Sequence, residues 1–282
     1  MARGRQAKRT IRTVEGERVA RRRDYLAVEE PLEIQLRAGG ERRVVAITMR
    51  TPGNDYELAA GFLHTEGIVA DKRAIDHMIY CVDGESAQQE YNALAVALHA
   101  PALPELPGLD RHFFINSACG VCGRTMLDEL SERPLPPMAP DMTVDADVIT
   151  GLATTLAARQ DIFSSTGGLH AAALFDRSGA LLAVREDVGR HNALDKLIGW
   201  GVLQQQLPFH DKIILVSGRA SYELLYKARV AGAPVFCAVS APSSLAAELA
   251  ARFDITLIGF LRDARFNIYS GEKRIAIAAK DR

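Results

Sequence analysis

Hydrophobic and polar positions follow one pattern before residue 133 and another after residue 143. In the first part, the spacing of Leu58, Phe62 and Leu63 predicts a helix over residues 55–64. Apolar or alternating runs predict strands, and a second helical run follows them. These segments are residues 44–48, 92–98 and 112–116 for the strands and 124–130 for the helix. The first part therefore predicts a smaller α+β domain.

Residues 133–143 separate the two patterns. They contain Pro134, Pro136, Pro137 and Pro140, and prolines at this density suit neither a helix interior nor a central strand. We therefore predict a linker here. It lies between an N-terminal domain over residues 24–132 and a C-terminal domain over residues 144–282.

Strands and helices alternate after the linker. Predicted strands are 171–175, 181–185, 212–217, 235–239 and 255–260, and predicted helices are 145–159, 192–200, 222–231 and 244–253. The first two strands are typical of a hairpin. The later β-α-β-α-β run predicts a parallel sheet covered by helices on both faces. The fold class is therefore α/β, with a larger three-layer C-terminal domain.

The net charge of −1 conceals an uneven distribution along the 282 residues. Residues 1–23 hold nine basic and two acidic side chains, a net charge of +7, which leaves −8 for the remainder. A solvated, mobile tail is the simpler interpretation. The alternative is a docking arm for an acidic partner or a polyanion. The tail lacks interleaved aromatic residues and the remainder is acidic, so we expect no nucleic-acid partner.

Composition narrows the class of protein further. Hydrophobic residues make up 48% and charged residues 24%, the mix of an ordinary globular protein. The longest apolar run is short of the roughly 18 residues that a membrane span needs, and no apolar segment follows the basic start. We therefore expect a cytoplasmic protein without membrane insertion and without structural disulfides.

Two of the four cysteines form a Cys-x-x-Cys motif, Cys119 and Cys122, flanked by glycines and followed by Arg124. A helix start and a nearby cation both favour the reactive thiolate. Two thiols at this spacing can accept sulfur as a persulfide and release it again. Structural zinc normally needs four ligands, and no second pair is present. Cys81 and Cys237 lie in apolar surroundings and are predicted to pack in the interior.

A zinc deaminase is the competing interpretation of the same cysteines. Such enzymes carry His-x-Glu followed by Pro-Cys-x-x-Cys. Here His64 and Glu66 precede Cys119 and Cys122, but Ala118 stands where the proline is expected. Ordinary helix-end roles explain His64 and Glu66 more simply. The expected metal content is therefore none, and a zinc-dependent hydrolase or zinc-binding module remains the alternative.

Polar side chains gather where the second predicted strand meets the next helix. Asp187, Arg190, His191 and Asn192 lie in this short segment, where ligands bind in open α/β sheets. His191 is a candidate general acid or base oriented by Asp187. A capping turn with an ion pair is the structural alternative.

Two further strand ends carry candidate anion ligands. Ser217, Gly218 and Arg219 form a turn whose backbone amides and guanidinium suit a phosphate, although the Walker ending is missing. Gly168 and His170 belong to another small polar turn. After the last parallel strand, Arg262 and Arg265 lie beside aromatic residues and suit a nucleotide. Several such turns in one domain predict a nucleotide-type pocket.

These strings together resemble the FdhD family of formate dehydrogenase accessory proteins. The resemblance rests on Ala118 to Gly123, Thr166 to His170, Arg185 to Lys196, Ser217 to Arg219, and Gly61 to Leu63 with Glu66 and Gly67. It covers nearly the whole chain after the basic tail. The tail itself is outside it.

The resemblance implies a sulfurtransferase that accepts sulfur from a cysteine desulfurase. The sulfur then passes to the bis-molybdopterin guanine dinucleotide molybdenum cofactor of the formate dehydrogenase catalytic subunit. Cys119 maps onto the persulfide position, with Cys122 assisting. The cofactor-binding segment maps onto Phe260, Leu261, Arg262, Asp263, Ala264 and Arg265. The family also implies a homodimer and a larger domain resembling the cytidine deaminase fold.

Overall fold

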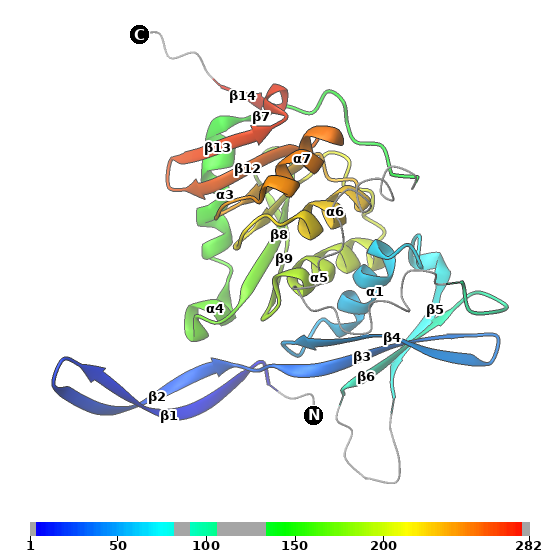
Figure 1. Ribbon diagram of the computed structural model, residues 1–282, viewed down its shortest axis with the longest axis horizontal. Helices are drawn as coiled ribbons and strands as arrows, with labels where there is room; N and C mark the ends of the chain where they lie inside the picture. The colour runs from blue at the N-terminus through cyan, green and yellow to red at the C-terminus, as the bar shows by residue number, and fades with distance from the viewer. Residues whose placement is uncertain (1–3, 82–90, 106–133, 278–282) are drawn as a thin grey trace.

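The computed structural model describes residues 4–81, 91–105 and 134–277 and shows a mixed α/β protein with several sheets (Figure 1). Within these residues, strands form one six-stranded sheet, one four-stranded sheet and two two-stranded sheets. Cys119 and Cys122 lie outside the described residues, as do the segments 112–116 and 124–130. No helix in the described residues is long and apolar enough to cross a membrane.

The six-stranded sheet has the order β13-β12-β11-β10-β8-β9. Its strands are β8 (His170–Phe175), β9 (Leu181–Asp187), β10 (Ile213–Val216), β11 (Val235–Ala238), β12 (Thr256–Arg262) and β13 (Arg265–Ser270). Strands β10, β11 and β12 are parallel, which confirms the predicted β-α-β-α-β run. Strands β8 and β9 form the predicted hairpin, and β8 runs antiparallel to β10.

Side chains alternate between the two faces of this sheet. On one face Ile214, Val216 and Phe236 pack with the helices α5, α6 and α7. On the other face Ile213 and Leu215 pack with α3. These helices are α3 (Ala146–Ala157), α5 (Arg190–Leu203), α6 (Tyr222–Val230) and α7 (Ser244–Arg252), with the short α4 (Asp161–Thr166) after α3. A sheet buried on both faces explains the continuous apolar runs of β10 and β11.

A four-stranded sheet of order β4-β3-β6-β5 forms the smaller part of the fold. Its elements are β3 (Glu30–Ala38), β4 (Glu41–Arg50), β5 (Ile75–Tyr80) and β6 (Ala93–Leu98), with the helix α1 (Asp55–Thr65) and the 3-10 helix η1 (Lys72–Ala74). The apolar face of α1 packs on this sheet in a second core. The predicted helix over 55–64 is thereby confirmed, and the predicted strand over 44–48 is the centre of β4.

Helices α1 and α5 cross at two glycines and join the smaller part to the larger one. A Cβ added to Gly61 would lie 1.9 Å from the carbonyl oxygen of Asp195. One added to Gly199 would lie 1.7 Å from the carbonyl oxygen of Glu57. Any side chain at either position would collide with backbone, so glycine alone permits this crossing.

Residues 134–143 contain no helix or strand. The segment ends at a small parallel pair of β7 (Val144–Asp145) with β14 (Ile275–Ala276), and the 3-10 helix η3 (Glu272–Arg274) precedes β14. The proposed domain boundary remains a prediction. What the structure adds is that the α1–α5 crossing joins elements on either side of it.

The basic N-terminal segment is not a tail without structure but a two-stranded hairpin. Strands β1 (Gln6–Glu15) and β2 (Arg18–Ala27) pair along their whole length, from Gln6 opposite Ala27 to Glu15 opposite Arg18. Gly16 turns the chain with a positive φ of 59°. The charge count favoured a tail because it ignored the β-branched residues Thr10, Ile11, Thr13 and Val14, which favour a strand.

Candidate functional site

Several predicted site residues meet at one edge of the six-stranded sheet. The carboxyl ends of β9 and β10 lie there beside the amino end of β8, because β8 runs antiparallel to both. The Ser217 hydroxyl accepts a hydrogen bond from the Ala171 amide at 2.9 Å. A Cβ on Gly218 would lie 3.3 Å from Nδ1 of His170, so these two residues are in contact. The predicted turns at residues 168–170 and 217–219 thus form one surface.

A chain of backbone contacts extends this edge to the β12–β13 hairpin. The Ser240 amide donates to the carbonyl oxygen of Gly218 at 3.3 Å, and the Phe260 amide donates to that of Ser240 at 3.1 Å. Arg262 Nε donates to the Val239 carbonyl oxygen at 3.4 Å. The segment 260–265 therefore lies along the same edge as His170, at β12, which is three strands away from β8.

Within that segment the side chains differ in availability. Arg262, Asp263, Ala264 and Arg265 are exposed, and Phe260 is half-buried. Leu261 is fully buried in the core. The family resemblance assigns all six residues to cofactor binding, but the Leu261 side chain faces the interior and can offer a ligand only its backbone.

Arginines surround two histidines at the sheet edge. The pKa of His170 is lowered by burial first and then by Arg190 and Arg219, while Asp187 opposes the change. The pKa of His191 is lowered to about 3 by burial, then by Arg190, Lys227 and His170. Both imidazoles are therefore neutral near pH 7, and the arginines carry the positive charge that an anionic ligand would meet.

Asp187 lies in the interior rather than on the exposed surface of this sheet edge. Its carboxylate is 2.7 Å from Nζ of Lys196, and both side chains are fully buried. The same carboxylate accepts hydrogen bonds from the amides of Thr51 at 3.1 Å and Gly189 at 2.8 Å. Asp187 therefore ties the end of β9 to the residue after β4.

Asn192 has a similar role. Its amide nitrogen donates to the carbonyl oxygen of Met49 at 2.8 Å and to Oδ1 of Asp187 at 3.3 Å. The sequence places Asn192 and Asp187 at a ligand, whereas the structure directs both side chains between the two sheets. Buried polar groups of this kind are commonly retained to fix geometry.

Glu223, not Asp187, is the carboxylate beside His191. Its Oε2 lies 3.1 Å from Nε2 of His191. The expected orientation of His191 by Asp187 is thus wrong, because the Asp187 oxygens are engaged by Lys196 and by backbone amides. Glu223 stands in the first turn of α6 and comes close to His191 only when α5 and α6 pack together.

Comparison with known proteins shows the family to which this chain belongs. The FdhD/NarQ family model matches residues 27–276. A "Sulfur carrier protein FdhD" of Nocardia farcinica is 48% identical over 259 residues, covering 90% of this chain and 89% of that protein. One of Streptomyces coelicolor is 46% identical and covers 99% and 98% of the two chains. This chain belongs to the FdhD/NarQ family.

A solved structure shares the fold. The crystal structure of a candidate formate dehydrogenase accessory protein from Desulfotalea psychrophila superposes with a TM-score of 0.76. It covers 97% of this chain and 100% of that one, at 23% identity. The likeness supports the arrangement of sheets and helices described above.

In this FdhD/NarQ chain a cavity of about 450 Å³ is lined in part by His191. Its wall is apolar where the smaller sheet and α1 contribute, and polar where α5 and α6 contribute. The apolar part includes Ile34, Ala46, Leu58 and Phe62, and the polar part includes Asn192, His191, Asp195, Glu223 and Lys227. The sequence pattern missed this cavity because its wall comes from five separate elements, β3, β4, α1, α5 and α6.

A buried ion pair closes the polar end of the cavity. Nζ of Lys227 lies 2.9 Å from both carboxylate oxygens of Asp195. Burial raises the pKa of Asp195 to about 6 although Lys227 opposes it. Burial disfavours the charged form of Lys227, but Asp195, Glu66 and Glu223 raise its pKa. Glu223 and Lys227 are four residues apart and therefore share one face of α6. That spacing was the sequence signal by which this part of the cavity wall could have been found.

Cys237, Cys81 and His64 behave as packing residues. Cys237 is fully buried and burial raises its pKa, as expected for an interior thiol. Cys81 is half-buried, with Sγ 3.4 Å from Nη2 of Arg37. His64 lies in the last turn of α1 with Nδ1 3.0 Å from the Val69 carbonyl oxygen. The described residues hold no cluster of three or more His, Cys, Asp or Glu side chains suited to a metal.

Proposed function

We propose that this chain is a sulfur carrier that accepts persulfide sulfur from a cysteine desulfurase and passes it to the molybdenum cofactor of formate dehydrogenase. The observation that carries the proposal is the 48% identity, over 90% of the chain, to a protein named as an FdhD sulfur carrier. The sequence motif Cys119-x-x-Cys122 supplies the thiols that such a carrier needs.

Transfer to the carrier needs no external oxidant. The Cys119 thiolate attacks the outer sulfur of the donor persulfide, the donor S–S bond breaks, and the donor leaves as a thiolate. Cys119 then holds the sulfur as its own persulfide. Attack of the Cys122 thiolate on Sγ of Cys119 would release that sulfur as hydrosulfide and leave a disulfide. A dithiol reductant must reduce this disulfide before the next cycle.

The sheet edge is the proposed site for the bis-molybdopterin guanine dinucleotide cargo. Arg190 and Arg219 offer fixed positive charge beside two neutral histidines, which suits diphosphate groups. Arg262 and Arg265 are exposed on the β12–β13 hairpin at the same edge. In this proposal His170, Gly168, Ser217 and Gly218 line the surface between them, and Asp187 and Asn192 hold it in place.

Three finer expectations accompany this proposal. The larger part of the fold would be related to the cytidine deaminase fold, the chain would act as a homodimer, and it would work in the cytoplasm. The zinc-dependent alternative keeps Cys119 and Cys122 as metal ligands.

Mass spectrometry of the peptide that holds Cys119 and Cys122 tests the proposal. After incubation with a cysteine desulfurase and cysteine, we expect the mass gain of one sulfur atom. Cys119→Ala should abolish the gain, Cys122→Ala should retain it, and Cys81→Ala serves as a control with the same chemical change elsewhere. A wild-type chain that gains no sulfur, or that carries one tightly bound zinc, would contradict it.

A further inference from the structure

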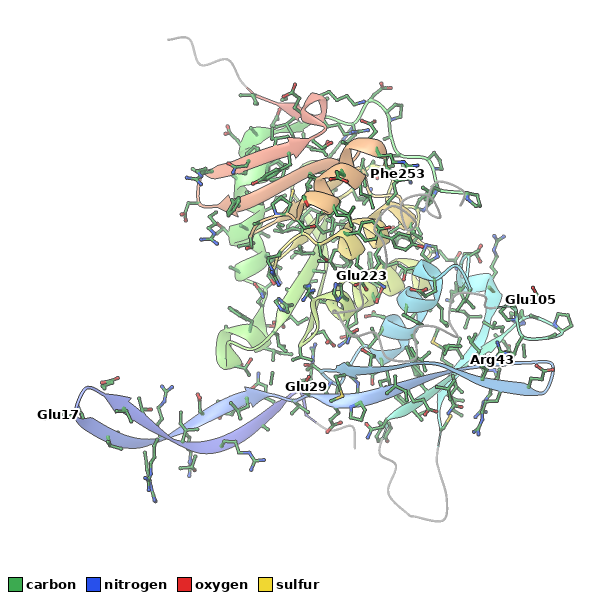
Figure 2. The ribbon with its side chains drawn as sticks, in the orientation of Figure 1. Glu17, Glu29, Arg43, Glu105, Glu223 and Phe253 are labelled. Carbon is green, nitrogen blue, oxygen red and sulfur yellow. The ribbon has the colours of Figure 1, made fainter. Side chains whose placement is uncertain are left out.

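The β1–β2 hairpin projects away from both larger sheets as an arm that contacts the rest of the fold at α4. Figure 1 shows it extending beneath α4, and Figure 2 places Glu17 at its free end and Glu29 where it joins β3. At its base Nε2 of the Gln6 side chain donates to the Ser165 hydroxyl at 2.7 Å, and the Val28 backbone amide donates to the Arg5 carbonyl oxygen at 3.0 Å. The family model begins at residue 27, so the arm lies almost entirely outside the matched region.

The strand register divides the arm into two faces, since directly paired residues share a face. One face, here called the basic face, carries five cross-strand pairs. They are Gln6/Ala27, Lys8/Tyr25, Thr10/Arg23, Arg12/Arg21 and Val14/Val19. The opposite face carries Ala7/Leu26, Arg9/Asp24, Ile11/Arg22, Thr13/Ala20 and Glu15/Arg18.

The opposite face carries three cations and two acids, whereas the basic face carries cations alone. Arg9 is paired with Asp24, and Glu15 with Arg18. The basic face has four cations and no acid, and it places Arg12 directly opposite Arg21. Like charges in that position destabilise a hairpin.

Within the described residues Lys8 Nζ lies over the Tyr25 ring, 5.7 Å from its centre, and this contact leaves the repulsion between Arg12 and Arg21 in place. Every member of the basic face except Ala27 is exposed, and no ion pair within residues 4–81, 91–105 and 134–277 engages its four cations. A two-stranded hairpin is itself only marginally stable in water. A negatively charged partner would remove the repulsion and add contacts along the arm.

The other side chains of the basic face favour a protein over a nucleic acid. Three of its four cations are arginines, and Tyr25, Val14 and Val19 are exposed beside them, the two valines by 65% and 61%. Arginine and tyrosine are enriched in protein interfaces, where apolar groups form the centre of the contact. A phosphate backbone offers nothing that a pair of exposed valines would bind.

We propose that the basic face of the β1–β2 arm is a docking surface for a carboxylate-rich patch on a partner protein. Within the proposed function, on which this choice of probes rests, the partner is either the desulfurase or the formate dehydrogenase. The arm recognises the partner, while the cargo surface lies at the sheet edge. Because the remainder of the chain carries a net charge of −8, the arm is the segment that attracts an acidic protein.

Matched neutralisations test the docking surface. Arg12→Gln/Arg21→Gln removes two charges from the basic face, and Arg9→Gln/Arg22→Gln removes two from the opposite face. The first variant also relieves the repulsion, so unfolding of the arm cannot explain a loss of binding. Purified cysteine desulfurase and formate dehydrogenase are each immobilised, and binding of the full chain is measured at low and physiological salt.

We expect Arg12→Gln/Arg21→Gln to weaken binding to one of the two proteins by about tenfold or more. Arg9→Gln/Arg22→Gln should change it by less than about threefold, and salt should weaken the wild type more than the first variant. Absence of binding to both proteins, or equal losses in the two variants, would overturn the proposal. So would tighter binding to a duplex DNA probe that is lost in the first variant.

Sulfur loading separates this inference from the proposed function. If the wild type gains sulfur from the desulfurase but neither double variant alters binding, only the docking surface is wrong. If the chain binds a partner through the basic face but gains no sulfur, only the sulfur-carrier function is wrong.

Discussion

The segment from Arg185 to Lys196 and the β1–β2 hairpin are both rich in charge, yet their charges are placed in opposite environments. In the first, Asp187 and Lys196 are fully buried and 2.7 Å apart, and Arg185 pairs with Glu57 of α1. In the second, Arg12 faces Arg21 in water with no acid on that face.

The difference separates charges that hold the fold from charges that remain available. A buried pair has lost its hydration and depends on its partner, so it fixes the position of the elements that carry it. An exposed and unbalanced cluster adds little to stability but keeps its field for a partner. The first kind lies where β9, α5 and α1 meet, and the second lies on an arm outside both cores.

The largest effect is expected at the helix crossing on which the buried region depends. Gly199→Ala places a Cβ against the Glu57 carbonyl oxygen, so α1 and α5 must separate. We expect a loss of about 3 kcal/mol or more in the free energy of unfolding, measured with urea.

Gly151→Ala is the matched control for this substitution. Gly151 lies in α3, and a Cβ there meets nothing within 4 Å. It should stabilise the chain by about 0.5–1 kcal/mol. Equal effects of the two substitutions would show that the crossing is not a rigid joint.

The next effect concerns the buried pair itself. Lys196→Met leaves the Asp187 carboxylate buried without its cation, and we expect a loss of about 3–5 kcal/mol. Lys212→Met breaks a half-exposed pair with Asp211 and should cost less than about 1 kcal/mol. Similar losses in urea unfolding would remove the distinction between buried and exposed charges. Adding Asp187→Asn to Lys196→Met should recover part of the stability.

A smaller effect is expected in the pH dependence of stability. The pKa of His191 is lowered to about 3 in the folded chain, against about 6.5 when unfolded. Between these values the unfolded chain binds the extra proton, so stability falls as pH falls from about 6.5. The raised pKa of Asp195, about 6, acts in the opposite direction between about pH 4 and 6.

Two single substitutions separate the opposing contributions to this pH dependence. His191→Gln should flatten the fall in stability below about pH 6.5, and Asp195→Asn should make it steeper. Unfolding free energies measured from about pH 5 to 7 test both. Parallel curves for the wild type and His191→Gln would show that His191 is not buried as a neutral group.

The smallest effect is expected in the arm. Arg12→Gln/Arg21→Gln removes a like-charge pair and should slow amide hydrogen exchange in β1 and β2 slightly, by a few tenths of a kcal/mol. Arg9→Gln/Arg22→Gln breaks the opposite-charge pair of Arg9 with Asp24 and should accelerate amide hydrogen exchange in both strands. Faster exchange in the first variant would mean that the basic face already has a partner group in the free chain.

Regular elements with a strong pattern could be predicted from the sequence. The helix over 55–64 and the parallel strands β10, β11 and β12 follow from apolar spacing and length. The β1–β2 hairpin was missed because a high local charge obscured the β-branched residues on either side of Arg12. Strand β13 was missed because it is half-exposed and its alternation is short.

The candidate site divides in the same way. The strand-end turns at His170 and Gly218 could be predicted to meet, because strand ends of one sheet share an edge. The inward orientation of Asp187 and Asn192 could not be predicted, because their partners Thr51 and Met49 lie more than a hundred residues away in the sequence. Glu223 had no local signal that would place it beside His191.

The sequence alone determined the α/β class, the family motifs and the uneven charge, because composition, spacing and strand–helix alternation are local properties. Only the tertiary structure decided which charges are buried and which are free. The distinction between Asp187 and Arg12 depends on what surrounds each side chain, and those neighbours are brought together by the Gly61–Gly199 crossing in one case and by strand register in the other.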